Sequence, residues 1–183
     1  RDALAALTLP MMEALDAQGI KQFHFHLPDA TSFFRVQKPD EFGDDLSTFR
    51  ETVVQANDTQ QVIEGLEGGV SGVSFRYVVP LSYEGQPIGT VELGFGLEED
   101  FLLKMKEDNK SDWLIYSLEN NESTYLFGTT EAQTVELLTD ELLQLQQGET
   151  IGKLVDQTKI TAFPLNDFSG NVKWILVGAH NYA

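Results

Sequence analysis

Two histidines open the part of the chain that is richest in side chains able to do chemistry, residues 24–50 (HFHLPDATSFFRVQKPDEFGDDLSTFR). His24 and His26 alternate with the apolar residues Phe23, Phe25 and Leu27. Because successive side chains of a strand point to opposite faces, a strand here places both imidazoles on one face and the apolar side chains on the other. The stretch also holds cations, aromatic rings and carboxylates without a recognisable catalytic set, and this mixture indicates a binding pocket.

A metal site at His24 and His26 needs at least one further ligand. The neighbouring candidates are Asp29, Asp44 and Asp45. The alternative is that both histidines are polar residues of a pocket wall, held by hydrogen bonds. An imidazole near its ordinary pKa also makes a ligand response depend on pH. We predict no metal ion, and keep His24 and His26 as the candidates for binding one.

Two arginines lie in strand-like segments that are otherwise apolar. Arg35 and Arg76 each need an acidic partner, a ligand anion or solvent, because an unpaired buried guanidinium is costly. Glu92, on the strand that returns after Arg76, is the expected cross-strand partner of Arg76, and contact of Arg76 with a ligand is the alternative. Arg35 together with Lys38 could bind a carboxylate, or both could be solvated surface residues.

Carboxylates and rings near these cations have more than one interpretation. Asp44 and Asp45 precede a helical pattern, which favours capping of the helix over a pair of carboxylates for acid–base chemistry; one of them could also face the pocket and bind a ligand amine. The rings that could form apolar pocket walls are those of Phe33, Phe34, Phe42, Phe75 and Tyr77. Alternation along a strand means that about half of such rings point into the core simply to pack.

Charge and composition exclude several functions. The 183 residues include 29 acidic and 12 basic residues, and the formal net charge of −17 opposes binding to nucleic acid or to an anionic membrane. Without cysteine there is no disulfide, thiolate metal site or cysteine nucleophile. The motifs G-x-S-x-G, H-E-x-x-H and G-x-x-x-x-G-K-[ST] are also missing from the sequence. We therefore predict a protein that is not an enzyme, needs no cofactor and does not bind nucleic acid.

The pattern of the first half predicts the elements that position these residues. We expect a helix over 3–17 that Pro10 kinks or breaks near Leu9, short strands over 23–27 and 32–36, a helix over 45–56, a strand over 60–66 and a glycine-rich link over 65–72. Residues 73–83 and 88–96 are strongly β-prone and flank Glu84-Gly85-Gln86-Pro87. They predict an antiparallel hairpin with a tight turn.

The second half repeats this order in outline. A helix over 97–106 precedes the polar segment 108–112, where we expect a domain boundary. Strands over 113–128, a helix over 131–147 and strands over 159–166 and 172–179 follow. No run approaches the roughly 18 apolar residues of a membrane span, and the first residues lack the features of a signal peptide.

The order of these features resembles the double Cache sensor domains of bacterial methyl-accepting chemotaxis proteins and sensor histidine kinases. The resemblance rests on the segments HLPDATSFFRVQKPDEFGDD and FRYVVPLSYEGQPIGTVELG. It implies an α+β fold of two PAS-like (Cache) modules, each with a central antiparallel sheet flanked by helices. The implied parts are residues 1–20, the end of a long N-terminal helix; 21–107, the membrane-distal and ligand-binding module; and 108–183, the membrane-proximal module.

The resemblance also implies a place in the cell and a partner. Such a domain is the periplasmic, extracytoplasmic part of an inner-membrane receptor, attached through flanking transmembrane helices outside this chain and homodimeric in the full-length protein. In similar proteins a small ligand lies between the distal sheet and the loops and helices that cover it. Signalling then follows from a shift of helices at the dimer interface.

Our hypothesis is that the distal module binds a small polar molecule with a carboxylate. Arg35, Lys38 and Arg76 bind the anionic end, His26 and Tyr77 form hydrogen bonds, and phenylalanines line the cavity. The full predicted set is His26, Phe34, Arg35, Lys38, Phe42, Asp44, Phe75, Arg76, Tyr77 and Glu92. Two alternatives are a soluble two-module adaptor or carrier that binds a protein partner, and a hydrolase with an unrecognised acid pair.

Overall fold

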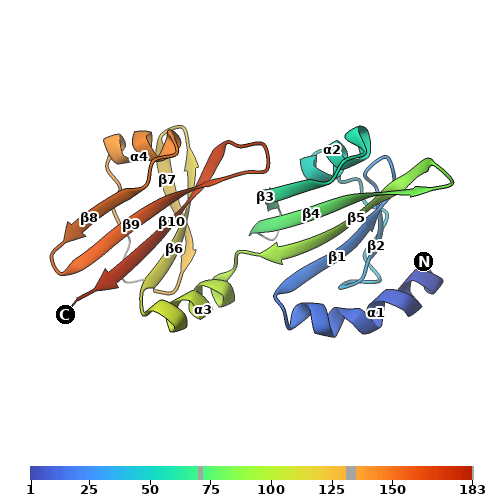
Figure 1. The fold of residues 1–183 in the computed structure, drawn as a ribbon, viewed down its shortest axis with the longest axis horizontal. Coiled ribbons are helices and arrows are strands. Elements are labelled where there is room, and N and C mark those ends of the chain that lie inside the picture. The colour runs from blue at the N-terminus through green and yellow to red at the C-terminus, as the bar shows by residue number, and fades with distance from the viewer. Residues whose placement is uncertain (70–71, 131–134, 183) are drawn as a thin grey trace. The chain divides into compact units, whose positions relative to one another are not determined.

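The structure, a computed structural model, describes residues 1–69, 72–130 and 135–182 of the chain. It divides into two compact units, a first unit of residues Arg1–Leu97 and a second unit of residues Glu98–Ala183 (Figure 1). The sequence placed the division between residues 107 and 108. The structure has it earlier because the helix of residues 99–109 packs against strands of the second unit.

The first unit is a five-stranded antiparallel sheet with a helix on each side (Figure 1). Its elements are α1 (Asp2–Asp16), β1 (Ile20–His26), β2 (Ser32–Arg35), α2 (Glu51–Thr59), β3 (Ile63–Gly69), β4 (Gly72–Tyr83) and β5 (Gln86–Gly96). The strand order is β2-β1-β5-β4-β3, so β1 and β5, far apart in the sequence, lie side by side in the centre.

The second unit repeats this architecture. Its elements are α3 (Glu99–Asn109), β6 (Asp112–Glu119), β7 (Glu122–Gly128), α4 (Thr139–Gln146), β8 (Ile151–Val155), β9 (Thr158–Asn166) and β10 (Val172–Asn181). The strand order β7-β6-β10-β9-β8 matches that of the first sheet element by element. The predicted α+β fold of two sheets flanked by helices is thereby confirmed.

The β4–β5 hairpin, the strongest structural prediction from the sequence, is present. Tyr83 pairs with Gln86 across a two-residue turn, in which Glu84 and Gly85 have φ of 49° and 76°. Two positive φ angles are the signature of the turn type whose twist matches that of the flanking strands. Glycine at the second position adopts this conformation without a steric cost.

Helix α1 covers one face of the first sheet. It continues through Pro10, so the predicted break near Leu9 does not occur. Its apolar side chains Leu4, Ala5, Met12 and Leu15 pack against a small core of Phe23, Phe34 and Val36. Burial of this apolar stripe outweighs the single backbone hydrogen bond that proline cannot make.

Helix α2 begins at Glu51, six residues later than the earliest predicted cap, because the residues before it have other partners. Asp45 pairs with Thr31 in a β-bridge, and its Oδ1 accepts the Ser47 N–H at 2.8 Å in a local turn. The side chain of Asp45 therefore closes a turn and does not cap the helix.

The bounds of β3 and α4 also differ from the prediction, and one strand was missed. Strand β3 continues to Gly69 because its glycines pair in register with β4, whereas residues 65–72 were predicted as a link, of which 70–71 lie outside the described residues. Helix α4 begins at Thr139, where the Leu138 N–H donates to Glu141 Oε2, and residues 131–134 of the predicted helix lie outside the described part. Strand β8 was not predicted.

The core of the second unit provides a direct test of its packing. Leu145 of α4 is fully buried, whereas Leu143 on the same helix is 43% exposed. We expect Leu145→Ala to lower the free energy of unfolding by ~2–5 kcal/mol, because the substitution leaves a cavity. The matched change Leu143→Ala should cost less than ~0.5 kcal/mol.

Both tryptophans, Trp113 and Trp174, lie in the second unit, so tryptophan fluorescence during urea unfolding reports on this unit. Equal losses of stability for the two leucine variants would contradict the described packing of α4.

Candidate functional site

The register of the first sheet brings polar side chains together on one buried face. His24 of β1 pairs directly with Glu92 of β5, and His26 pairs with Thr90. Arg76 of β4 follows on the same face, because Val78, two residues along, pairs with Glu92. Helix α2 packs over this face, and α1 lies on the other side of the sheet (Figure 1).

Arg76 is the centre of the site. Its side chain is 1% exposed, and its Nη1 donates to Glu92 Oε1 and, at 2.6 Å, to Gln22 Oε1. Gln22 reaches Arg76 across Gly94, which has no side chain between them. The predicted cross-strand pair of Arg76 and Glu92 is therefore present.

Glu67 of β3 connects this pair to helix α2. Its Oε2 lies 3.0 Å from Arg76 Nε, and its two oxygens accept the backbone N–H and the hydroxyl of Thr52 at 2.9 and 3.0 Å. Thr52 is in the first turn of α2, where backbone N–H groups have no partner within the helix. Glu67 therefore serves both as the counter-ion of Arg76 and as the cap of α2.

Arg50 brings a second guanidinium to this group. We call the whole set the ionic cluster, and it consists of Arg50, Glu67, Arg76, Glu92, His24 and His26. Arg50 Nη1 lies 3.6 Å from Glu67 Oε2. A Cβ built on Gly69 would lie 3.1 Å from Arg76 Nη2 and 3.2 Å from Arg50 Nη1, so glycine makes room for both cations. The two guanidiniums and two carboxylates balance to zero formal charge.

The two histidines are neutral members of the cluster. His24 Nε2 lies 2.8 Å from Ser32 Oγ, and His26 Nδ1 lies 2.9 Å from Thr90 Oγ1. Burial lowers the pKa of His26 from 6.5 to about 4, although the Glu92 carboxylate raises it. Burial and the charge of nearby cations likewise hold the pKa of His24 far below its ordinary value.

Glu92 stays ionised despite its burial. Removal from water by itself raises the pKa of its carboxyl, but the charges of Arg76 and Arg50 reverse this and leave the pKa below its ordinary value. Burial and the neighbouring Arg76 lower the pKa of Arg50, yet a guanidinium remains protonated at any physiological pH.

Several buried polar atoms of the cluster have no hydrogen-bond partner among the described residues. They are His26 Nε2, Glu92 Oε2, Arg50 Nε and Nη1, and Arg76 Nε. Arg76 Nε forms an ion pair with Glu67 Oε2 at 3.0 Å, but the two groups are not aligned for a hydrogen bond. Native proteins leave few such groups unsatisfied, so each one requires a reason. The cluster offers both donors and acceptors to a polar guest.

A sequence model described as "Double sensory domain of two-component sensor kinase", dCache_3, matches residues 1–177. The chain belongs to this double Cache family. The resemblance to double Cache sensor domains drawn from the sequence is confirmed, and the family is one of double sensory domains of two-component sensor kinases.

Solved structures share the fold of this double Cache domain. The putative sensory box/GGDEF family protein domain of Vibrio parahaemolyticus matches with a TM-score of 0.63 at 13% identity, over 100% of this chain and 80% of its own. The isoleucine-bound sensory domain of the Campylobacter jejuni chemoreceptor Tlp3 matches with a TM-score of 0.54 at 8% sequence identity. The match covers 100% of this chain and 75% of the Tlp3 chain. An extracellular ligand binding receptor from Desulfohalobium retbaense gives 0.61 at 11%, over 90% of this chain but only 31% of the receptor.

At 8–13% identity, these likenesses show that the fold is shared. No curated protein matches the chain. Among the described residues, no helix has the length and apolar character needed to cross a membrane.

The second Cache module shows that the fold does not require the ionic cluster. By strand order, β6 and β10 correspond to β1 and β5. Their side chains on the α4 face are apolar and form the core, among them Leu114, Tyr116, Ile175 and Val177. Because buried ion pairs commonly stabilise a protein less than apolar packing does, charges in the first module indicate a function other than stability.

The structure separates the predicted cations and acids into two groups. His26, Arg76 and Glu92 belong to the ionic cluster. Arg35 instead donates two hydrogen bonds of 2.7 Å to the carboxylate of Asp44, in a pair near the surface. Asp44 is therefore the partner of Arg35 and not a helix cap, and exposed Lys38 pairs with Glu41 at 3.3 Å.

The predicted aromatic residues lie away from the cluster. Phe34 is in the core under α1, on the opposite face of the sheet. Phe75 and Tyr77, which flank Arg76, point to that same opposite face and are each 42% exposed. Phe42 is 47% exposed, with the Arg1 guanidinium 3.3 Å from its ring centre.

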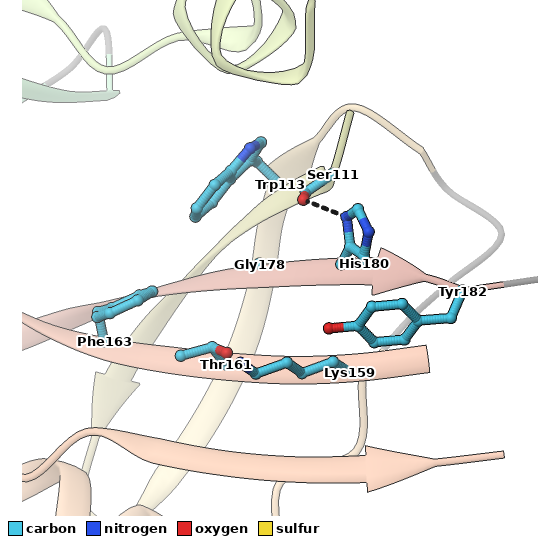
Figure 2. Close-up of a pocket in the computed structure, with 8 residues that line it drawn as sticks. All are labelled: Ser111, Trp113, Lys159, Thr161, Phe163, Gly178, His180 and Tyr182. Carbon is cyan, nitrogen blue, oxygen red and sulfur yellow. Dashed lines mark hydrogen bonds between the residues drawn. The ribbon is translucent and has the colours of Figure 1, made fainter. Parts of the chain in front are cut away.

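A pocket of about 340 Å³ lies in the second unit, where the sequence predicted none. It is lined by Ser111, Trp113, Lys159, Thr161, Phe163, Gly178, His180 and Tyr182 (Figure 2). Ser111 Oγ and His180 Nδ1 share a hydrogen bond of 3.0 Å, which is the dashed line in Figure 2. A Cβ on Gly178 would lie 3.0 Å from the Trp113 ring, a tight contact that the ring would have to relieve by a small shift.

Removal of Arg76 gives a test of the ion-pair network. Arg76→Met leaves the Glu92 carboxylate buried without its main counter-ion, so we expect a loss of ~3–5 kcal/mol in the free energy of unfolding. Adding Glu92→Gln removes that charge and should restore a large part of the loss. Urea unfolding followed by far-ultraviolet circular dichroism measures both. A double variant no more stable than Arg76→Met would contradict the pairing.

The histidines predict a loss of stability in acid. Between pH 6.5 and 4 the unfolded chain binds a proton at His26 that the folded chain does not, so stability is complete above pH 6.5 and falls as the pH approaches 4. The depression of the pKa corresponds to on the order of 3 kcal/mol. Urea unfolding in metal-free buffer at several pH values measures the slope, and His26→Gln should make it shallower. An unchanged slope would contradict the assignment.

Proposed function

We propose that this double Cache domain is the extracytoplasmic sensing part of a transmembrane chemoreceptor or sensor kinase, and that its first unit binds a small polar molecule with a carboxylate. The ionic cluster is the observation that supports this proposal. It places two guanidiniums, two carboxylates and two imidazoles where the sister module has an apolar core. A receptor site with this composition recognises charge and hydrogen-bonding pattern before shape.

Arg50 is the anchor of the proposed guest. Its Nε and Nη1 are buried and lack hydrogen-bond partners among the described residues, with Glu67 Oε2 3.6 Å from Nη1, so the guanidinium retains donors that a carboxylate can accept from. Arg76 lies next to it and adds positive potential. From the set predicted by sequence, the proposal keeps Arg76, His26 and Glu92 and adds Arg50.

The acceptors of the cluster favour a guest with a donor group as well. Glu92 Oε2 and His26 Nε2 are buried, 3.5 Å apart and without hydrogen-bond alignment to each other. A protonated amine beside Glu92 and a carboxylate beside Arg50 would match the neutral balance of the cluster. The solved Tlp3 sensory domain has isoleucine bound, a molecule with these two groups. Amino acids are therefore the first class of ligand to test.

Ligand access couples binding to helix α2. Because His26, Arg76 and Glu92 are almost fully buried, a guest reaches them only when the segment over them moves. Glu67 binds the first turn of α2 and Arg76 at once, so a guest that engages the cations changes what holds the helix. Such coupling typically amounts to ~1–3 kcal/mol, enough to shift a receptor between two arrangements. Flanking transmembrane helices and a homodimer in the full-length receptor complete the proposal.

A thermal-shift screen of amino acids, small monocarboxylates and dicarboxylates, and their uncharged amides tests this function, because a ligand that binds the folded protein raises the melting temperature further as its concentration rises, with the logarithm of concentration above Kd. For a hit, we expect calorimetry to show at least ~10-fold weaker binding to Arg50→Gln, since a charged hydrogen bond contributes ~1.5–3 kcal/mol. The matched control Arg35→Gln removes a guanidinium that already pairs with Asp44, and should bind as the parent does.

Two other results would assign the ligand to a different site. Loss of affinity in Arg35→Gln but not in Arg50→Gln would support the loop site first predicted from the sequence. A ligand-induced change in Trp113 fluorescence, together with loss of affinity in Lys159→Gln, would place the ligand in the pocket of the second unit.

A further inference from the structure

Three side chains of the cluster have the types and spacing of a metal site. His24, His26 and Glu92 each offer a ligand atom, and these atoms all lie within 4.8 Å of one another. We propose that the three residues bind one divalent transition-metal ion, with Zn²⁺ as the ion that suits them best. The ion and a donor group of the proposed organic guest would use the same two atoms, Glu92 Oε2 and His26 Nε2, so the two occupants would compete.

The three candidate ligands are held by paired central strands. His24 and Glu92 are direct partners across β1 and β5, and His26 is two residues along β1 on the same face. The His24 and His26 rings have centroids 4.1 Å apart. Ligands on neighbouring strands are fixed by the backbone ladder, so little conformational freedom is lost when an ion binds.

Two of the ligand atoms are buried and have no hydrogen-bond partner among the described residues. Besides the spacing of the three residues, this is a second observation that points to a bound ion. His26 Nε2 and Glu92 Oε2 have no hydrogen-bond partner among the described residues, and both side chains are 0% exposed. They lie 3.5 Å apart. Each atom has a free lone pair in the form that binds a metal, namely a neutral imidazole and an ionised carboxylate.

Neighbouring residues orient the ligands in the way that metal sites require. The Thr90 hydroxyl binds His26 Nδ1, which leaves Nε2 as the coordinating nitrogen, and the Ser32 hydroxyl holds the His24 ring. Arg76 binds the other oxygen of Glu92, Oε1. Such second contacts fix the ring orientation and the tautomer of metal ligands.

The ligand set and the surrounding charge select the ion. Two imidazoles and one carboxylate suit Zn²⁺, Co²⁺, Ni²⁺ or Cu²⁺, whereas Mg²⁺ and Ca²⁺ prefer oxygen ligands. Arg50 and Arg76 oppose any cation here, and Glu67 and Glu92 offset them. Only an ion that gains strongly from nitrogen ligation can overcome this repulsion, so we expect discrimination against Mg²⁺.

The composition of the chain makes the test sharp. There is no cysteine and there are three histidines, so tight binding of a nitrogen-preferring ion must use His24, His26 or His180. Calorimetric titration of the chelator-treated full chain with ZnCl₂ should show one equivalent bound, with MgCl₂ bound far more weakly. His180→Gln should bind Zn²⁺ as the parent does, whereas His26→Gln and Glu92→Gln should bind at least ~10-fold more weakly.

A measurement on the unsubstituted protein covers the case in which a variant fails to fold. Adding Zn²⁺, or paramagnetic Co²⁺, should perturb the imidazole NMR signals of His24 and His26 and leave those of His180 unchanged. Weak binding of several ions, equal for Zn²⁺ and Mg²⁺ and unaffected by the histidine substitutions, would overturn the proposal and assign the ions to the acidic surface. Because no organic acid is present, that result would leave the carboxylate-binding function standing.

Discussion

The first unit depends on the neutralisation of one fully buried guanidinium. Arg76 of β4 takes its partners from three other strands: Gln22 of β1, Glu92 of β5 and Glu67 of β3. An unpaired charge in this position would cost several kcal/mol, so the register that supplies these partners is tightly constrained. Glu67 extends the constraint to α2 through Thr52. One cation thus links most of the sheet to the helix that covers it.

The two modules separate what the fold requires from what a site requires. They share strand order and the placement of helices, but the face that is ionic in the first is aliphatic and aromatic in the second. The first module accordingly has only a small apolar core beneath α2, made of Ala30, Val53, Ala56 and Val78. A module that gives up apolar packing for charges loses stability, a pattern that natural proteins show at functional sites.

The sequence was informative where the signal was local. The β4–β5 hairpin followed from alternation and a Glu-Gly turn, and the pairing of Arg76 with Glu92 followed from a cation and an acid in its two apolar strands. The shared face of His24 and His26 followed from their spacing alone. Each of these three inferences uses a period of two residues or a turn of known length, and none of them depends on distant parts of the chain.

The other members of the cluster and the face of the aromatic rings depend on contacts between distant parts of the chain, which local sequence patterns do not contain. Glu67 was hidden because a glycine-rich strand resembles a link until its partner strand is known, and Arg50 because the helix was expected to begin before it. The rings of Phe34, Phe75 and Tyr77 show the same limit. Alternation assigns them to a common face, but only the docking of α1 decides that this face lies away from the cluster.

The joint role of Glu67 sets a physical condition on any signal. A ligand shifts a receptor only by the difference in its affinity for two arrangements. Here the carboxylate that neutralises Arg76 also accepts the backbone N–H and the hydroxyl of Thr52 at the start of α2, so a guest that neutralised the cations would weaken the hold on Glu67 without breaking a covalent or apolar contact. In the proposed receptor, charge balance in the cluster and the position of α2 would form a single equilibrium, because Glu67 takes part in both.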